Sequence, residues 1–303
     1  MKFKLGFASA LVLVSSLASM ASAHTFLRTL TIDGKQTEVG QCIEPYHGPD
    51  KTSGVKDPAS DDMTCGFPGS SKDADLCPVE AGSEIRAEFR NYDTEEEADG
   101  KFNMAIDESH QGPCFAYMAP LESGGKGDVW FKIFEDGYSS GSWCVNKIRF
   151  SMGFMNITIP KDILPGDYLL RTEVIGLQEA MYEYEAGQKK GAQYFINCAH
   201  ITVSGSGTAE PDGYAIPGIY KQDEPSILFD LDKDDATKYV TPGPPLYVPG
   251  SSSAEKAVDQ NTSATNNAKA VEHNEPSSSS VENSEISSST SKPRDCKKKR
   301  RRR

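Results

Sequence analysis

Short β-rich segments separated by turn signals recur along the first two thirds of the chain, and they restrict the fold more than any other feature. Asp33-Gly34 follows the first segment, and Leu164-Pro165-Gly166-Asp167 precedes the fifth. Several segments alternate apolar and polar residues, as half-buried strands do. The pattern predicts an all-β, antiparallel β-sandwich with long functional loops at 44–75, 124–128 and 181–190. The predicted strands are residues 26–32, 84–89, 115–118, 156–160, 168–175 and 198–203.

The first 23 residues predict a secretory signal peptide. Lys2 and Lys4 precede an apolar run at 11–17, and Ala21-Ser22-Ala23 is a typical cleavage site. Cleavage there would make His24 the first residue of the mature chain. A terminal histidine can chelate one metal ion through its α-amine and its imidazole. A histidine could also follow the cleavage site by coincidence, and the signal alone does not decide between these interpretations.

Secretion permits disulfide bonds. Six of the seven cysteines lie in residues 24–250, and their spacing leaves open which of fifteen pairings is formed. No later segment has the roughly 18 apolar residues that span a bilayer, so we expect a soluble or surface-associated monomer. The formal net charge is −12 although nine of the last twelve residues are basic, so the body is strongly acidic. An acidic body argues against nucleic acid as a partner and favours a neutral polymer or a small molecule.

The C-terminal part changes composition twice. Residues 204–250 are rich in Gly and Pro and should pack along the sandwich through aromatic side chains. Residues 251–291 are rich in Ser, Glu, Asn and Thr without aromatics, which predicts a disordered linker. The basic tail at 292–303 predicts attachment to an anionic surface. The predicted organisation is therefore a signal at 1–23, a domain at 24–250, a linker and a tail, with N-glycosylation sequons at Asn156 and Asn261.

Few histidines are available as metal ligands. His110 lies in Ser109-His110-Gln111-Gly112-Pro113, in a connection between strands. With the two nitrogens of His24 it would supply three nitrogen ligands, an array that redox-active copper prefers. Taken alone, His110 is more simply a surface-loop histidine. Three histidines remain. His47 lies in a loop and is a minor candidate, His200 is predicted to be structural in the last strand, and His273 lies in the linker.

A glutamine and an aromatic residue follow near the last strand. Gln193 and Phe195 are two residues apart, so they share one face of an extended segment. Gln193 could hydrogen-bond an oxygen species beside a metal, and Phe195 could cover the metal axially. The alternative is a solvent-facing strand edge.

Several motifs that follow one another along the chain resemble those of the fungal lytic polysaccharide monooxygenases of auxiliary activity family nine, once classed as glycoside hydrolase family sixty-one. Each motif is weak alone, but their joint order after a terminal histidine is specific. They are His24, Ser109-His110-Gln111-Gly112-Pro113, Trp130-Phe131-Lys132-Ile133, Ile157-Thr158-Ile159-Pro160, residues 165–171, Gly191-Ala192-Gln193 and residues 242–247.

The resemblance implies a secreted copper enzyme with an immunoglobulin- or fibronectin-like sandwich. Copper would be held by a histidine brace of His24 and His110. The implied reaction is cleavage of β-1,4-glucan such as cellulose at C1 or C4, with O2 or H2O2 and an external electron donor. The resemblance also places Tyr214 on the flat polysaccharide-binding face. It implies the disulfide Cys65–Cys198, with Cys114–Cys144 as the next pair.

Two positions depart from the family pattern. Phe195 stands at the axial position, where the family usually has tyrosine, and Tyr194 comes one residue early. Gln178 stands where the family carries a histidine near the oxygen species. A histidine can donate a proton near neutral pH, whereas glutamine donates only a hydrogen bond. We therefore expect copper binding to be retained better than the catalytic rate, and a non-catalytic secreted copper-binding or cell-wall protein remains the alternative.

Overall fold

The computed structural model describes residues 25–46, 52–67, 69–70, 73–91, 105–188 and 190–250. The predictions for the signal, the linker and the tail lie outside these residues. So do those for His24, His47, Asn261 and His273.

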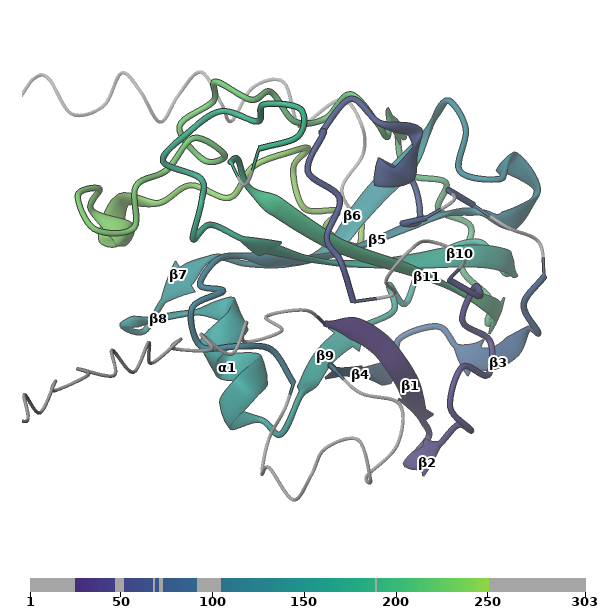
Figure 1. Ribbon diagram of the computed structural model, residues 1–303. Coiled ribbons are helices and arrows are strands. Elements are labelled where there is room, and N and C mark those ends of the chain that lie inside the picture. Colours follow the sequence, from purple (N-terminus) through teal and green to yellow (C-terminus); the bar gives the residue numbers. More distant parts are fainter. Residues whose placement is uncertain are drawn as a thin grey trace, which may run out of the picture. The chain divides into compact units, whose positions relative to one another are not determined.

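Two β-sheets lie face to face, with the larger sheet above the smaller one in Figure 1. The smaller has the strand order β2-β1-β4-β9, and the larger has the order β12-β6-β5-β10-β11-β3. This arrangement confirms the predicted all-β sandwich. The smaller sheet contains β1 (Phe26–Ile32), β2 (Lys35–Gln36), β4 (Glu84–Arg90) and β9 (Phe154–Thr158). The larger contains β3 (Cys77–Glu80), β5 (Cys114–Pro120), β6 (Asp128–Asp136), β10 (Gly166–Gly176), β11 (Gln193–Ser204) and β12 (Tyr214–Ala215).

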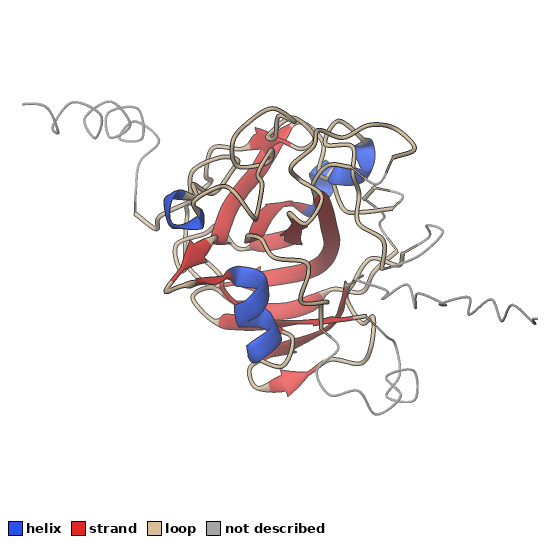
Figure 2. Ribbon diagram, turned by 60° about the vertical axis from the view of Figure 1, so that its left-hand side comes forward, coloured by secondary structure: helices blue, strands red, loops and turns tan. Residues whose placement is uncertain are grey.

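The remaining elements are short and lie at the margins of the sheets (Figure 2). β7 (Tyr138–Ser139) and β8 (Ser142–Trp143) form a hairpin that leads into helix α1 (Cys144–Phe150). The 3₁₀ helices are η1 (Asp61–Met63), η2 (Leu121–Ser123) and η3 (Ala236–Lys238). None of the helices in the described ranges has the length and apolar character needed to cross a membrane.

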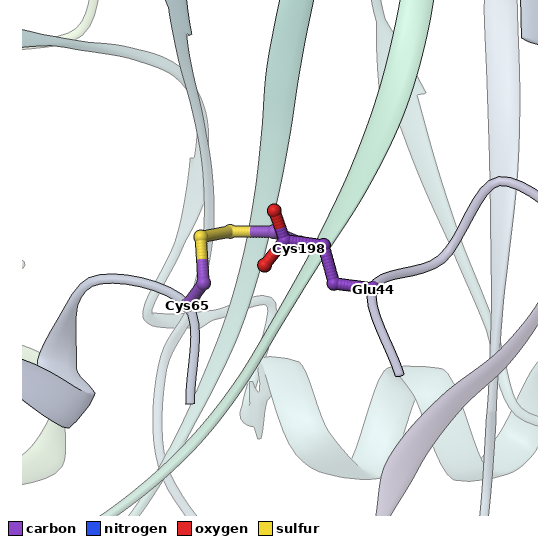
Figure 3. Close-up of side chains that lie close together, drawn as sticks. All are labelled: Glu44, Cys65 and Cys198. Atoms are coloured by element: carbon purple, nitrogen blue, oxygen red, sulfur yellow. A yellow bond between two sulfur atoms is a disulfide. The ribbon is translucent and has the colours of Figure 1, made fainter. Parts of the chain in front are cut away.

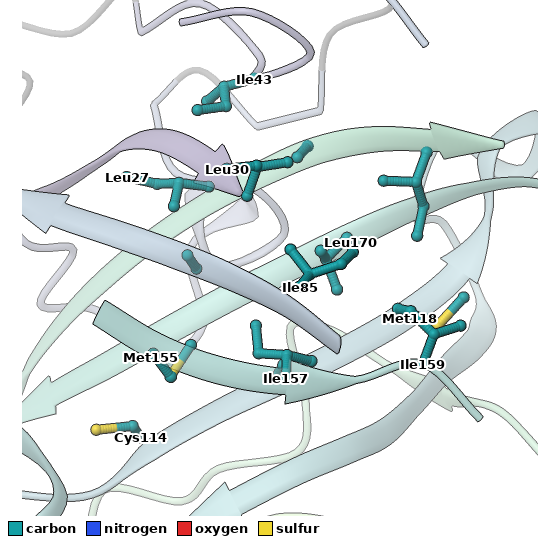
Figure 4. Packing of buried hydrophobic residues seen from close by; sticks show 14 of the residues in the cluster. Leu27, Leu30, Ile43, Ile85, Cys114, Met118, Met155, Ile157, Ile159 and Leu170 are labelled. Carbon is teal, nitrogen blue, oxygen red and sulfur yellow. The ribbon is translucent and has the colours of Figure 1, made fainter. Parts of the chain in front are cut away.

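The core between the sheets explains the alternating sequence pattern of the smaller sheet. Leu30, Ile85 and Ile157 of that sheet are fully buried and project toward Met118 and Leu170 of the larger one (Figure 4). Successive residues of a strand face opposite sides, so the outward residues of β9 are exposed. The period-two pattern therefore identified these strands correctly.

The larger sheet is covered on its outer face too. Tyr194 of β11 stacks on Tyr220, with ring centroids 5.6 Å apart. Tyr117 of β5 shares a hydrogen bond of 3.0 Å with the Tyr220 hydroxyl. Phe229 is buried in the same cluster, whereas Tyr247 packs on Phe131 in the core between the sheets. The aromatic residues after residue 204 thus pack on the sandwich as predicted. Because β10 is buried on both faces, its sequence is not alternating.

Two charges are fully buried on this outer face. Arg171 and Glu173, both on β10, form an ion pair of 2.8 Å. Arg171 also donates hydrogen bonds to the carbonyl oxygens of Met63 and Thr64, at 2.9 Å and 3.0 Å. The Tyr220 hydroxyl donates to Glu173 at 2.7 Å. Burial raises the pKa of Tyr220 well above 10, and the Glu173 carboxylate raises it further. This network joins β10 to the two segments that cover it.

Three disulfide bonds link the described cysteines. Cys65–Cys198 and Cys114–Cys144 are the two pairs that the family resemblance implied. The third, Cys42–Cys77, connects the segment after β2 to the beginning of β3. It resolves the connectivity that the spacing left open.

The structure also contains elements that the pattern did not predict. β3 pairs with β11 in parallel, so the larger sheet is not wholly antiparallel. Its second residue is Pro78, which is tolerated because β3 is an edge strand. Helix α1 was missed because it has only seven residues, too few for a clear helical period.

Replacing Glu173 by Gln should destabilise the protein strongly. Glu173→Gln keeps the side-chain shape but leaves the Arg171 guanidinium without its carboxylate. Breaking a buried pair in this way costs about 3–5 kcal/mol in the free energy of unfolding, which urea titration would measure. The matched control, Glu185→Gln, removes an exposed pair with Lys190 and should change it little. Equal losses in the two variants would contradict the importance of the buried pair.

Candidate functional site

Two of the predicted site residues, His110 and Gln178, lie at the same end of the larger sheet. β5 begins there, β10 ends there and β11 begins there, because Val174 pairs with Cys114 and Gly176 pairs with Gln193. His110 lies just before β5, and Gln178 lies just after β10. The pairing of these strands therefore brings together residues that are far apart in the sequence.

His110 is buried, with 3% of its surface exposed, and not a surface-loop histidine. It follows a tight turn in which Asp107 accepts hydrogen bonds from the backbone N–H (2.9 Å) and the hydroxyl (2.7 Å) of Ser109. An Asp two residues before its donor is a common turn former. Burial raises the pKa of Asp107, but the Ser109 hydrogen bonds and the positive charge of Arg149 outweigh it and lower that pKa.

The hydrogen bonds around His110 select one form of its ring. The Ser109 hydroxyl donates to Asp107, so its oxygen is left to accept from His110 Nδ1, 3.1 Å away. His110 Nε2 lies 3.1 Å from the amide nitrogen of Gln178, which can only donate. The network therefore places the proton on Nδ1 and the lone pair on Nε2. This lone pair accepts from Gln178 here, and Nε2 would become a potential metal ligand once the Gln178 amide turns away.

This contact gives a hydrogen-bond partner to only one of the two polar atoms of the Gln178 amide. Its oxygen Oε1 is buried and has no hydrogen-bond partner within the described ranges. Gly176 lies against the same pair of side chains: a Cβ atom on it would be 2.6 Å from Gln178 Oε1 and 3.2 Å from His110 Cδ2. A buried amide oxygen beside a histidine lone pair marks this end of the sheet as polar and able to bind a ligand.

Phe195 forms the apolar wall of the site. Its ring centroid is 5.4 Å from that of His110, at an interplanar angle of 55°. Gln193 is half-buried on the same strand, and a Cβ atom on Gly54 would be 3.3 Å from both Gln193 Cβ and Phe195 Cε1. Tyr194 belongs to the opposite face, where it stacks on Tyr220. Tyr194 therefore cannot supply the tyrosine that the family usually has at the position of Phe195.

The residue after His24 is fixed beside this end of the sheet. The Thr25 hydroxyl donates a hydrogen bond of 2.7 Å to the carbonyl oxygen of Ala105, five residues before His110. The N–H of Leu27 donates at 2.9 Å to the side-chain oxygen of Asn197, two residues after Phe195. His24 itself lies outside the described residues.

Tyr214, which was predicted to lie on the polysaccharide-binding face, lies at the opposite end of β6 from the strand end near His110. Tyr214 pairs with Trp130 at the beginning of β6, whereas Cys114, near His110, pairs with Asp136 at its end. These two positions of β6 are separated by about 20 Å at the usual rise per residue. The sequence could not reveal this separation because it depends on the direction of β6.

A different exposed tyrosine lies in the loop that follows Gln178. Tyr182 follows Gln178 by four residues in a loop that the Gly191 N–H closes onto the Glu179 carbonyl oxygen at 3.0 Å. Half of its surface is exposed, and the Lys190 ammonium lies 5.4 Å from its ring centroid. Sequence reasoning missed Tyr182, although it stands in a long loop of the kind expected to carry function.

A second group of ligand-type residues does not form a metal site. Glu44, Cys65 and Cys198 have ligand atoms within 4.8 Å of one another, but the two sulfur atoms are bonded to each other (Figure 3). A disulfide offers no thiolate to a metal. Glu44 instead contacts His200 Nε2 at 2.8 Å. His200 thus has the structural role that the sequence predicted.

Comparison with known proteins gives a consistent set of relatives. Residues 24–239 match Auxiliary Activity family 9 (formerly GH61). The AA9 family lytic polysaccharide monooxygenase A of Aspergillus fumigatus is 35% identical over 86% of this chain and 71% of its own length. Monooxygenase D of Malbranchea cinnamomea is 35% identical over 75% of this chain and 93% of its own. This chain spans 64% of monooxygenase A of Aspergillus clavatus, with 35% identity over 78% of this chain.

Solved structures agree with this family. CvAA9A superposes with a TM-score of 0.66 at 30% identity, covering 74% of this chain and 98% of its own. A cellulose-active polysaccharide monooxygenase from M. thermophila gives 0.57 at 26%, covering 74% of this chain and 99% of its own.

Replacing Ser109 by Ala should change the proton position on His110. Ser109→Ala removes the acceptor for Nδ1–H, a contact worth about 1 kcal/mol, so the ratio of the two neutral ring forms should shift roughly fivefold toward Nε2–H. Imidazole ¹⁵N NMR of the metal-free protein would measure this ratio. The signals of His200, which contacts Glu44, should not move. A proton on Nε2 in the unsubstituted protein would contradict the hydrogen-bond assignment.

Proposed function

This chain belongs to Auxiliary Activity family 9, the lytic polysaccharide monooxygenases, and from that premise we propose that it is a secreted, copper-dependent enzyme that cleaves β-1,4-glucan oxidatively. The observation that carries the proposal is the buried His110, whose hydrogen bonds leave the Nε2 lone pair as an acceptor. The alternative is a non-catalytic copper-binding or cell-wall protein with the same fold.

The residues of the site fit a copper ion. The proposed ligands are the α-amine and imidazole of His24 and the imidazole of His110, three nitrogens of the kind that copper prefers. Thr25 is fixed beside Ala105, which supports the placement of the adjacent His24 near His110. Metal-binding histidines commonly donate their second N–H to a hydrogen-bond acceptor, and Ser109 with Asp107 would fulfil this role here. Copper bound there would supply the redox chemistry that uses O2 or H2O2 and an external electron donor.

The surrounding residues would orient ligands and exclude water. Phe195 is buried beside His110 and would cover the axial side without offering a phenol. Gln178 could donate a hydrogen bond to an oxygen species but could not release a proton at neutral pH. Gln193 on the same strand would offer a second amide. This set of residues supports ligand positioning more strongly than proton transfer.

The polysaccharide would contact the surface beside this site. Tyr182 takes the place proposed earlier for Tyr214, because it projects from the loop next to Gln178 with half of its surface exposed. Aromatic rings provide broad apolar contact area with a polar edge, which suits a sugar chain. The relative from M. thermophila is cellulose-active, so we propose cellulose or a related glucan, with attack at C1 or C4, as the substrate.

The parts outside the described residues complete the proposal. We propose a signal peptide at 1–23, the monooxygenase domain at 24–250, a linker at 251–291 and a basic tail at 292–303. The mature protein would be an extracellular monomer. The tail would retain it on an anionic wall or membrane surface through its charge.

Copper binding should require a free N-terminal His24. A mature protein that begins at His24 should bind one copper ion and release oxidised oligosaccharides from cellulose with a reductant. An additional Ala before His24 removes the terminal amine ligand, and His110→Ala removes the other histidine. Each should weaken copper binding by more than the roughly 10–100-fold that a lost supporting contact costs. Calorimetry and product mass spectrometry would measure binding and activity. Copper binding without oxidised products on several glucans would favour the non-catalytic alternative.

Replacing Gln178 by His should distinguish a slow enzyme from a non-catalytic protein. A well-placed proton donor contributes about 10²–10⁴-fold to a rate. We expect measurable turnover before the substitution and a gain of about 10²–10⁴-fold after Gln178→His. Gln178→Ala is the control for the loss of the amide. Product formation that appears only in Gln178→His would show that the natural site is non-catalytic.

A further inference from the structure

A second feature of the surface lies on β9, in the smaller sheet. Asn156-Ile157-Thr158 is a sequon within this strand. Ile157 is fully buried, whereas Asn156 and Thr158 face outward and are exposed. β9 is an edge strand that pairs only with β4 among the described strands. The asparagine is thus presented on a rigid, accessible edge.

Two side chains next to Asn156 form a platform for a sugar. Phe154 is two residues earlier on the same face of β9 and is half-buried. Arg86 pairs with Asn156 across the sheet, and its guanidinium carbon lies 4.1 Å from the Phe154 ring centroid. Within the described part of the chain, Arg86 forms no hydrogen bond or ion pair. It therefore retains its donors for a ligand that rests on Phe154.

A cleft continues from this platform toward α1. Its volume is about 590 Å³, within the roughly 300–1,000 Å³ that small ligands occupy. One wall is apolar, with Ile148 and Met155, and the Lys147–Asp136 ion pair of 2.7 Å lies beside it. Met152 borders the cleft with 48% of its surface exposed. An amphipathic cleft of this kind suits a sugar, which has apolar ring faces and polar edges.

We propose that Asn156 carries an N-linked glycan and that its first N-acetylglucosamine rests on Phe154 and Arg86 at the entrance of this cleft. The sugar would pack against the part of the Phe154 ring that the guanidinium groups of Arg86 and Arg90 leave uncovered, and the acetamido oxygen would accept a hydrogen bond from Arg86. Because this sugar would be covalently attached to Asn156, it is the proposed occupant of the cleft entrance. The glycan also covers the free edge of β9, where an exposed strand would otherwise pair with other chains.

The modification uses the ordinary chemistry of the secretory route. The Asn156 amide nitrogen attacks the anomeric carbon of an oligosaccharide carried on a lipid pyrophosphate. An N–C bond forms, the C–O bond to the pyrophosphate breaks, the lipid pyrophosphate leaves with the bonding electrons, and the amide loses one proton to a base of the host transferase. The inference rests on the secretion that is part of the proposed function, but not on copper or catalysis.

Glycopeptide mapping of the full-length protein, secreted from a fungal host, tests the modification. Release by peptide N-glycosidase in ¹⁸O water converts a glycosylated Asn156 into labelled Asp. We expect Asn156 to be occupied and Thr158→Ala to abolish the label. An unmodified Asn156 overturns the inference. If Asn261 is occupied in the same sample, secretion holds and only the inference at Asn156 fails.

The rate of glycan release tests the packing. Native protein should release the Asn156 glycan about tenfold more slowly than unfolded protein, because the sugar is held against an aromatic ring. Phe154→Ala should remove this protection, and Phe154→Tyr, which keeps the ring, should preserve it. Phe150→Ala is the matched control, because Phe150 is 78% exposed and does not line the cleft. Equal release rates from native Phe154→Ala and from the native unsubstituted protein overturn the proposed packing.

Discussion

The pairing of β10 with both of its neighbours is the constraint on which the sandwich and the candidate site depend. β10 pairs with β5 from Tyr168 to Val174 and with β11 along its whole length. This register places the end of β10, and hence Gln178, between the residues before β5 and those that begin β11. A slip of one residue would turn Phe195 away from His110 and expose core side chains. The buried Arg171–Glu173 pair adds polar contacts that only one arrangement of the covering segments satisfies.

The sequence predicted most strands of the smaller sheet because one face of that sheet meets solvent. In β9 and β4 the alternation of buried and exposed residues is visible directly. In the larger sheet the sequence predicted β5, β10 and β11, although β5 and β10 are buried along most of their length. It missed β3, β6 and β12. The parallel pairing of β3 depends on long-range contacts that no local pattern encodes. The resemblance supplied two disulfide pairs that spacing alone left open.

The candidate site was predictable in its residue types and less so in its geometry. The motif around His110 identified a possible ligand, but the roles of Asp107 and Ser109 depend on a turn whose side chains contact each other. The position of Tyr214 depends on a loop that returns to the beginning of β6, which no local pattern encodes. Tyr182 could have been noticed as an aromatic residue in a long loop. The structure shows that it lies half-exposed in the loop that joins β10 to β11.

The two departures from the family pattern have one physical consequence. Tyr194 cannot replace the missing axial tyrosine, because adjacent residues of β11 face opposite sides and Tyr194 stacks on Tyr220. Gln178 approaches His110 through its amide nitrogen and leaves a buried oxygen without a partner in the described part of the chain. Both changes remove a group that can release a proton and keep the shape of the site. The ligand atoms and the apolar wall are thus compatible with metal binding, while proton delivery must come from water or from the substrate.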